Sequence, residues 1–188
     1  LGWTDALIDG VAENEDLYRA RIRREVVHVT RTVQRLLELS RWEYSEPVLM
    51  VEDVLLSELL MEVAETLQEA AEHQGTELEF EGLSPSLAIA ADRVKARDVL
   101  QILLENVIEH AGEGVHCRVS IVGDDGRVRI SVCDDGAGYP SSLLEAFAEG
   151  RTFNEQGHAS LGIAIAARLT KAHHGSLVLS NLASGGAC

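Results

Sequence analysis

The sequence predicts an α+β fold: a two-layer sandwich of helices on a mixed, mostly antiparallel sheet, preceded by a helical hairpin. Three observations in the 188-residue chain predict it. A heptad pattern of apolar residues runs from about residue 16 to residue 42. Helix-like and strand-like segments then follow one another, and residues 117–132 have the alternation of a β-hairpin. We expect two units, a truncated dimerisation-type hairpin over 1–46 and a second domain over 47–188.

The first unit rests on one apolar seam. The residues before it, from Trp3 to Ile8, have the pattern of the end of another helix, broken near Gly10. Two helices of this length cannot bury a full stripe alone, so we expect a second copy of the chain to complete a four-helix bundle, making a homodimer. The alternative is that the seam packs on the chain's own globular part. The members of the seam, spaced by four and three residues in turn, are Ile22, Val26, Val29, Val33, Leu36 and Ser40.

The second unit begins where Pro47 ends the helical region, because the residue before a proline is pushed out of the helical conformation. Asp53 is the expected N-cap of a helix over 55–74, which Gly75 ends. Two short strands are expected next, over 77–81 and 87–91.

The rest of the second unit is read from caps, alternation and turns. Asp92 is the expected cap of a helix that continues through His110. The hairpin turns at residues 123–126, with the sequence Gly-Asp-Asp-Gly. A helix over 161–173 and a last strand over 176–180 complete the pattern.

Charge and length exclude some classes of function. Sixteen Lys and Arg residues against 31 Asp and Glu residues give a net charge of −15, so we expect no nucleic-acid partner. A small anionic ligand remains compatible, because backbone N–H groups and a metal ion can hold phosphates on an acidic protein. No apolar run has the length of a membrane span, so the stretch itself is expected to be cytoplasmic.

The cysteines and the chain ends carry two further expectations. Cys117, Cys133 and Cys188 lack metal-ligand spacing, which predicts reduced thiols. The chain starts at Leu1 rather than at a methionine and stops after a glycine-rich turn, so both ends read as cut. The parent protein could therefore be anchored in a membrane.

Two groups of residues combine polar side chains with glycines or helical spacing. Asp134 follows a strand, and Gly136 and Gly138 remove side chains where a ligand approaches closely. Asn106 and His110 lie one helical turn apart; an amide oxygen is a suitable ligand for Mg²⁺, and the imidazole could reach a phosphate. Taken singly, an ordinary Asp-Gly turn and an asparagine satisfied in the core are the favoured explanations.

A third group opens the last helix. Ser160, Leu161 and Gly162 join a loop of small residues to a helix, which directs free N–H groups toward an anion. Such junctions are common, so this feature is also weak when taken alone.

In this order the three groups resemble the ATP-binding domain of two-component sensor histidine kinases, within the GHKL superfamily. Residues 103–110 resemble the N box of that family, and residues 133–140 resemble its first glycine box. Residues 161–175 resemble the second glycine box with its helix, and Phe147 or Phe153 could stand for the phenylalanine box. Residues 36–43 are similar to the second helix of the dimerisation domain.

The resemblance implies a Bergerat-type ATP-binding fold and a role for each site residue. Asp134 would bind the adenine amino group, Asn106 would hold Mg²⁺ between the phosphates, and His110 would lie near them. Gly136, Gly138 and residues 160–162 would let the nucleotide approach, beneath an ATP lid over about 149–160. The implied activity is transfer of the γ-phosphate of ATP to a histidine just upstream of Leu1, and from there to a response regulator.

Departures from the family pattern keep other functions open. Ile102 stands where relatives carry a polar residue, and His158 and Ser160 stand where they usually carry glycines. The chain could therefore be a degenerate pseudokinase that serves as a dimeric docking module with weak or no ATP binding. A third option is a serine kinase of the anti-sigma-factor type. Such kinases share the ATP-binding fold but lack a dimerisation hairpin, which residues 16–42 are expected to supply here. His28 lies near the seam and is interpreted as a packed or surface residue, not as the phosphoacceptor.

Overall fold

The computed structural model describes residues 48–124, 126–150 and 159–188, together with eight residues between 19 and 37. It divides the chain into two compact units, Leu1–Ser45 and Glu46–Cys188. The eight described residues of the first unit are all helical: Arg19, Ile22, Arg23, Val26, Val29, Thr30, Val33 and Leu37. Three of the seam residues, Val26, Val29 and Val33, are 58%, 51% and 49% exposed. Leu36 and Ser40 lie outside the described residues.

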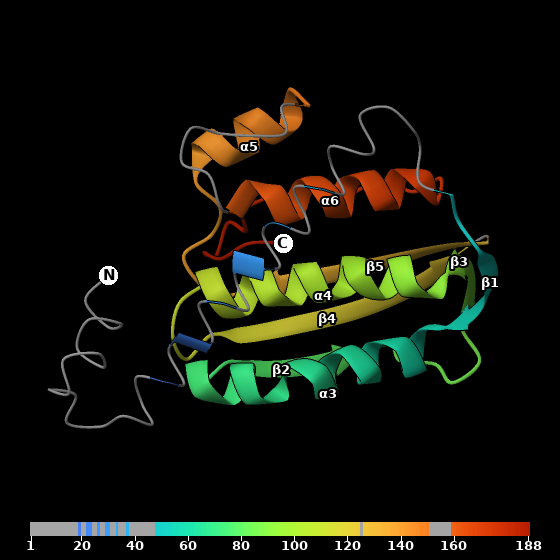
Figure 1. The fold of residues 1–188 in the computed structure, drawn as a ribbon, viewed down its shortest axis with the longest axis horizontal. Helices are drawn as coiled ribbons and strands as arrows, with labels where there is room; N and C mark the ends of the chain where they lie inside the picture. Colours follow the sequence, from blue (N-terminus) through green and yellow to red (C-terminus); the bar gives the residue numbers. More distant parts are fainter. Residues whose placement is uncertain are drawn as a thin grey trace, which may run out of the picture. The chain divides into compact units, whose positions relative to one another are not determined.

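The second unit contains the elements that position the candidate site (Figure 1). Its strands are β1 (Val51–Leu55), β2 (Glu77–Glu81), β3 (Ala88–Asp92), β4 (His116–Asp124) and β5 (Arg127–Asp134). Its helices are α3 (Leu56–Gln74), α4 (Arg93–His110), α5 (Ser141–Ala148) and α6 (Ala159–Ala172). None of the described helices is both long and apolar enough to cross a membrane.

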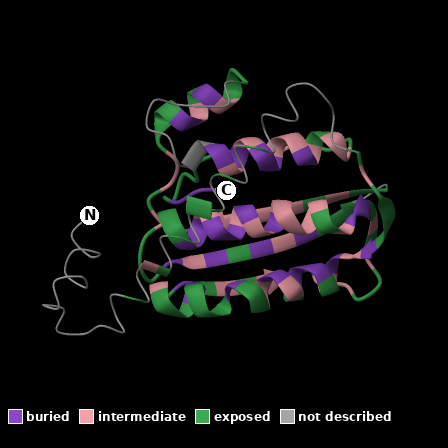
Figure 2. Cartoon of the chain, viewed as in Figure 1, coloured by how far each residue is buried: buried purple, intermediate pink, exposed green. Residues whose placement is uncertain are grey.

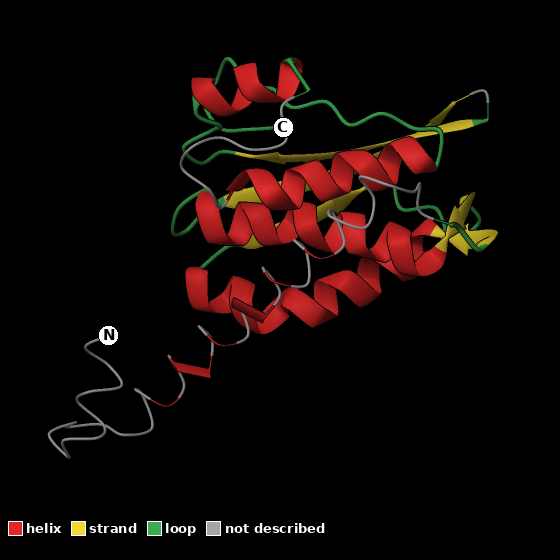
Figure 3. Ribbon diagram, turned by 45° about the horizontal axis from the view of Figure 1, so that its top comes forward, coloured by secondary structure: helices red, strands yellow, loops and turns green. Residues whose placement is uncertain are grey.

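The strands form two small sheets instead of one. β1 pairs with β3 in antiparallel register, and a second sheet has the order β2-β4-β5. β2 is parallel to β4, and β4 is antiparallel to β5, which places Cys117 opposite Asp134. Helices α3, α4 and α6 lie side by side against one face of the larger sheet, with α4 in the middle (Figures 1 and 3). The predicted sandwich of helices on a mixed sheet is confirmed.

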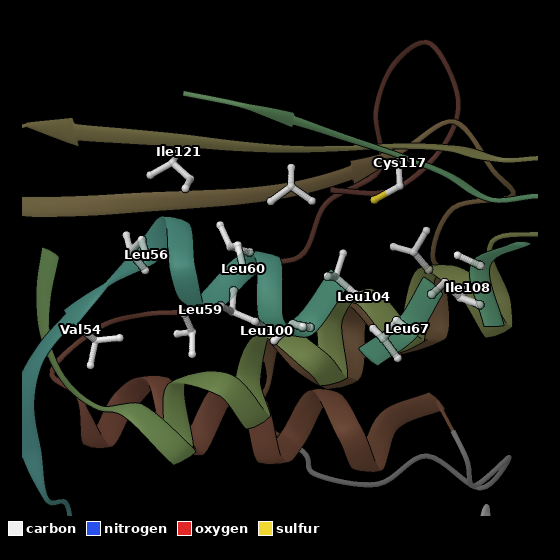
Figure 4. Packing of buried hydrophobic residues seen from close by; sticks show 14 of the residues in the cluster. Val54, Leu56, Leu59, Leu60, Leu67, Leu100, Leu104, Ile108, Cys117 and Ile121 are labelled. Atoms are coloured by element: carbon white, nitrogen blue, oxygen red, sulfur yellow. The ribbon is translucent and has the colours of Figure 1, made fainter. Parts of the chain in front are cut away.

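The core lies between the helices and the larger sheet (Figures 2 and 4). One side of α3 and one side of α4 are buried, and Val119 of β4 faces them with 0% exposure. Apolar residues three or four positions apart share one face of each helix, and every second residue of a strand shares one face of the sheet. These two kinds of face pack against each other in the core. The fully buried leucines of α3 and α4 are Leu56, Leu59, Leu60 and Leu104.

The predicted caps have opposite outcomes. Asp92 is the N-cap of α4, and its carboxylate accepts a hydrogen bond from the Lys95 N–H at 3.0 Å. The expectation that Asp53 caps α3 is wrong: Asp53 lies inside β1, opposite Ala90, and α3 begins three residues later. Strand pairing outweighs the local capping preference there, because it satisfies backbone groups over five residues.

Two more expectations need correction. The strand expected over 176–180 is not formed; beyond α6 the described strand contact is an isolated bridge between Asn181 and Ala187. The expectation of reduced thiols is wrong for two cysteines, because Cys133 and Cys188 form a disulfide. Cys117 is free and buried, and burial raises the pKa of its thiol to about 12.

Candidate functional site

Asp134 ends β5 as a buried acidic residue, 6% exposed. Its Oδ1 accepts hydrogen bonds from the N–H of Gly136 at 2.9 Å and of Ala187 at 3.4 Å. Within the described part of the chain, no donor contacts its Oδ2. One oxygen therefore fixes the carboxylate, and the other remains able to accept a hydrogen bond from a ligand.

The neighbouring Asp135 has a different task. It is exposed, and its Oδ1 accepts a hydrogen bond from the N–H of His116 at 2.8 Å. Its own N–H donates to the carbonyl of His116 at 3.3 Å. Asp135 therefore ties the loop to the start of β4, and the structure distinguishes it from Asp134.

Gly136 lies against the C-terminal end of α4. The N–H of Ala137 donates to the carbonyl of Ala111 at 3.0 Å. A Cβ added at Gly136 would collide with that carbonyl oxygen and would lie 2.7 Å from the Cβ of Ala111. The missing side chain thus permits a backbone contact that joins the glycine loop to the helix carrying Asn106.

Gly138 and Tyr139 are held by the end of the chain. Gly138 has a φ of +76°, a conformation that glycine adopts without strain. The N–H of Tyr139 donates to Oδ1 of Asn181 at 2.7 Å, and Nδ2 of Asn181 donates to the carbonyl of Tyr139 at 2.9 Å. Both polar groups of one backbone unit are therefore satisfied by a single side chain.

Asn106 and Asp134 come together at Tyr139. Burial of the ring raises the pKa of Tyr139, the negative charge of Asp134 raises it further, and the nearby side chain of Asn106 opposes them. The two polar residues predicted from separate motifs thus share one location, with a tyrosine between them.

The remaining predicted residues are less closely joined. His110 is exposed in the last turn of α4. Ser160, Leu161 and Gly162 lie in the first turn of α6, where backbone N–H groups lack partners within the helix. The side chain of Leu161 is buried, so only its backbone could meet a ligand. Most of the expected lid, residues 151–158, lies outside the described residues, as does Phe153, whereas Phe147 lies in α5.

This fold is that of a defined protein family. Residues 91–188, just over half of the chain, match the family described as histidine kinase-, DNA gyrase B- and HSP90-like ATPases. The chain belongs to this family, and its fold and relatives identify it as the catalytic domain of a sensor histidine kinase.

Named relatives support this class. The sensor protein DivL of Caulobacter vibrioides is 25% identical over 183 residues, which are 96% of this chain and 24% of DivL. The histidine kinase BaeS of Escherichia coli is 27% identical over 191 residues, covering 98% of this chain and 41% of BaeS. The chain therefore spans less than half the length of these relatives.

Solved structures agree with the sequence comparison. The catalytic domain of the histidine kinase ThkA is 26% identical with a TM-score of 0.65, covering 74% of this chain and 92% of that domain. The Acinetobacter baumannii histidine kinase AdeS has a TM-score of 0.76 at 20% identity, over 99% of this chain and 88% of AdeS. Because the identity to AdeS is only 20%, this match shows that the two proteins share a fold and nothing further.

Sequence reasoning missed two contributors to the site. Tyr139 lies inside the glycine motif, but nothing in the motif indicates that its backbone is held by Asn181. Asn181 is 42 residues from Tyr139 in the sequence, and no local pattern indicates their pairing. The available signal was Asn181 shortly before Gly185 and Gly186, and this combination is typical of ordinary turns, so it does not indicate a contact with Tyr139.

Proposed function

We propose that the chain binds Mg-ATP and transfers the γ-phosphate to a histidine on a dimerisation helix, for relay to a response regulator. The observation that supports the proposal is the convergence of α4, which carries Asn106, with the end of β5 and the glycine loop: the loop is hydrogen-bonded both to Asp134 and to Ala111 at the end of α4. Family membership supplies the nucleotide-binding class. The residues then divide the work of holding the nucleotide.

Asp134 recognises the base. Its Oδ1 is fixed by two backbone N–H groups, which leaves Oδ2 to accept a hydrogen bond from the amino group of adenine. A buried, ionised acceptor makes a stronger hydrogen bond than a neutral one. Gly136 packs against Ala111 and Gly138 packs against Asn181, so the two glycines set the shape of the loop that follows this carboxylate.

Asn106 and the start of α6 serve the phosphates. The half-buried amide of Asn106 offers an oxygen of the kind that Mg²⁺ prefers, and the N–H groups of residues 160–162 suit phosphate oxygens. A magnesium ion, when bound, neutralises charge on the phosphate oxygens. The protein contributes mainly positioning, which suffices for a loose phosphoryl-transfer transition state.

The proposed transfer also needs an acceptor histidine and a partner protein. We place the phosphoacceptor histidine just upstream of Leu1, on the first helix of the hairpin. A solved structure holds the histidine kinase ThkA with the response regulator TrrA, and the fold of that kinase has a TM-score of 0.73 to this chain. A receiver domain of a response regulator is therefore the proposed partner.

A second copy of the chain is the proposed partner of the hairpin. Val26, Val29 and Val33 follow one helix face, and each is about half exposed or more in the single chain. A dimer would bury this apolar stripe in a four-helix bundle. Sedimentation should find a dimer that Val29→Asp converts to a monomer, and a monomeric unaltered chain would contradict the proposal.

The nucleotide site is tested by isothermal calorimetry with Mg²⁺ and a non-hydrolysable ATP analogue. Asp134→Asn keeps an oxygen for the two N–H groups but removes the charge, so affinity should fall about ten- to a hundredfold, because hydrogen bonds to charged groups are worth about 1.5–3 kcal/mol. The matched control is Asp135→Asn, which alters the adjacent residue and should leave affinity within about twofold. Equal effects of the two substitutions would refute the assignment of Asp134.

One observation favours a second candidate function. Ile102 lies one helical turn before Asn106 and is 5% exposed, so this position supplies neither a metal ligand nor a base. A pseudokinase that acts as a dimeric docking module would tolerate this substitution. The same calorimetry separates the two functions, because a docking module should give no binding heat up to millimolar nucleotide.

A further inference from the structure

Residues 180–188, here called the C-terminal segment, lie against the end of β5. The N–H of Asp134 donates to the carbonyl of Ala187 at 2.9 Å, and the N–H of Ala187 donates to Oδ1 of Asp134 at 3.4 Å. Gly186 packs so closely that an added Cβ would collide with the carbonyl oxygen of Asp134. The segment therefore holds both the backbone and the carboxylate of the residue proposed to recognise the base.

The same segment holds the far end of the glycine loop. Asn181 accepts from the N–H of Tyr139 at 2.7 Å and donates to the carbonyl of Tyr139 at 2.9 Å. A Cβ added at Gly138 would lie 3.0 Å from Oδ1 of Asn181 and 3.2 Å from the carbonyl oxygen of Gly186. The C-terminal segment thus braces the loop at its start, through Asp134, and at its end, through Tyr139.

One covalent bond fastens this segment to the sheet. Cys188 forms a disulfide with Cys133, the residue directly before Asp134. Ser180 and Cys188 exchange two backbone hydrogen bonds, of 2.9 and 2.8 Å, so the segment is a closed loop that is fastened as a whole. Both disulfide cysteines are partly exposed, whereas Cys117 is buried. A reductant in solution therefore has access to the disulfide, and access is one of the factors that set the rate of thiol–disulfide exchange.

We propose that Cys133 and Cys188 form a reversible thiol–disulfide site that sets the nucleotide affinity. The disulfide keeps the C-terminal segment against Asp134 and the glycine loop, and reduction by a dithiol releases the segment. A thiolate of the dithiol attacks one sulfur, the S–S bond breaks, and the second thiol of the reductant then displaces the remaining cysteine. Two protein thiols and one oxidised reductant result, and a disulfide oxidant reverses the exchange. The proposal rests on the proposed function and adds regulation of the same site.

Reduction leaves the hydrogen bonds of the segment possible but no longer enforced by a covalent link. The braced loop is then populated for part of the time, and the apparent Kd rises in inverse proportion to that populated fraction. A segment that is docked for about a tenth to a third of the time gives an apparent Kd about three- to tenfold higher.

The first test is amide hydrogen exchange of the chain without nucleotide, with and without dithiothreitol. The N–H groups of Asp134, Tyr139 and Ala187 should exchange at least about tenfold faster after reduction, because their acceptors are released. The N–H of Thr76, which donates to the carbonyl of Ala71 at the end of α3, is the control and should not change.

Thiol counting shows whether the disulfide is reduced in the folded chain. Alkylation followed by mass spectrometry should find one thiol before reduction and three after it. Unchanged exchange at the three amides in a chain with three free thiols would overturn the proposal. A disulfide that dithiothreitol reduces only when the chain unfolds would also overturn it, because the bond would then be purely structural.

The second test is calorimetry with Mg²⁺ and the non-hydrolysable ATP analogue on the oxidised and the reduced chain. Reduction should weaken binding about three- to tenfold. Cys188→Ser should bind like the reduced chain whether or not dithiothreitol is present, and Cys133→Ser serves the same comparison if that variant does not fold. The matched control, Cys117→Ala, retains the disulfide and should keep the response to the reductant.

The result separates redox control from the proposed function. If the oxidised chain binds the nucleotide and reduction leaves the affinity unchanged or makes it tighter, redox control alone fails. If neither form binds the nucleotide, the proposed function fails, and control of nucleotide affinity fails with it. Hydrogen exchange then still reports whether the disulfide fastens the loop.

Discussion

Replacing Gly136 by alanine tests whether the glycine loop and α4 are joined as the structure places them. The Cβ of the new alanine would lie 2.7 Å from the Cβ of Ala111, whereas ordinary contact begins at 3.4 Å. The two backbones must therefore separate by at least about 0.7 Å, the difference between these distances, and the collision with the Ala111 carbonyl oxygen adds to this. That shift would lengthen the 3.0 Å hydrogen bond from the Ala137 N–H to the Ala111 carbonyl beyond a useful length.

The cost follows from these two changes. Overpacking a tight contact costs about 1–3 kcal/mol, and loss of one hydrogen bond adds about 1 kcal/mol. The free energy of unfolding of Gly136→Ala should therefore be about 2–4 kcal/mol lower, and each kcal/mol lowers Tm by roughly 2–4 °C in a chain of this size. Urea and thermal unfolding followed by circular dichroism measure both quantities.

A matched glycine substitution makes the result specific. A Cβ at Gly123 would lie 3.3 Å from Cδ1 of Leu87, which is the movable end of a side chain and not backbone. Gly123→Ala should therefore cost less than about 1 kcal/mol. The reasoning is refuted if Gly136→Ala is as stable as the unaltered chain, or if the two substitutions cost the same.

Two further predictions concern charge. Asp92→Ala should lower the free energy of unfolding by about 0.5–2 kcal/mol in chemical denaturation, because the residue caps α4. Hydrogen bonding from the Met50 N–H lowers the pKa of Asp92, so the stability that ionised Asp92 contributes is present above its ordinary pKa and is lost as pH falls through the lowered pKa. Asp92→Asn should therefore make the free energy of unfolding less sensitive to acid. An unchanged dependence of stability on pH would contradict this prediction. The hydrogen bond with Glu79 raises the pKa of His116 above its usual 6.5. The stability contributed by this pair is therefore fully present below pH 6.5 and is lost as pH rises through the raised pKa of His116. In a proton NMR titration Glu79→Gln should return this pKa toward 6.5, and a pKa that stays raised would exclude Glu79 as the cause.

The sequence predicts the elements that local physics decides. Asp92 caps α4 because the N–H three residues on needs an acceptor, and this requirement is visible in the sequence. The β4–β5 hairpin follows from its alternation and its glycine-containing turn. Asp53 has equal capping chemistry, but pairing of β1 with β3 decides its conformation, and that pairing joins residues almost forty positions apart.

Helix α5 and residues 176–180 differ from the sequence prediction because their local sequence signals are weak or misleading. Helix α5 is eight residues long, and its N-cap residue, Pro140, makes no side-chain capping hydrogen bond. Residues 176–180 alternate like a strand, yet the hydrogen bonds there begin only at Ser180, which pairs with Cys188. Alternation predicts a strand only where a neighbouring strand is available to complete the ladder.

The candidate site shows the same limit. Asp134 and Asp135 are adjacent and chemically identical, so composition and spacing alone cannot assign their roles. The N–H of His116 engages Asp135 at the sheet edge, while burial and the glycine loop isolate one oxygen of Asp134. Family resemblance selected Asp134 in advance, and the hydrogen bonds supply the physical reason.

The net charge of −15 makes short-range contacts to the nucleotide important for its binding. A triphosphate approaching an acidic protein is repelled at long range, so affinity must come from short-range groups that offset this repulsion. Asn106 on α4 is an amide, Asp134 on β5 is a carboxylate, and the start of α6 offers backbone N–H groups, so these three groups supply no positive side chain. The orientation of a single amide oxygen therefore matters more here than it would beside a lysine or an arginine.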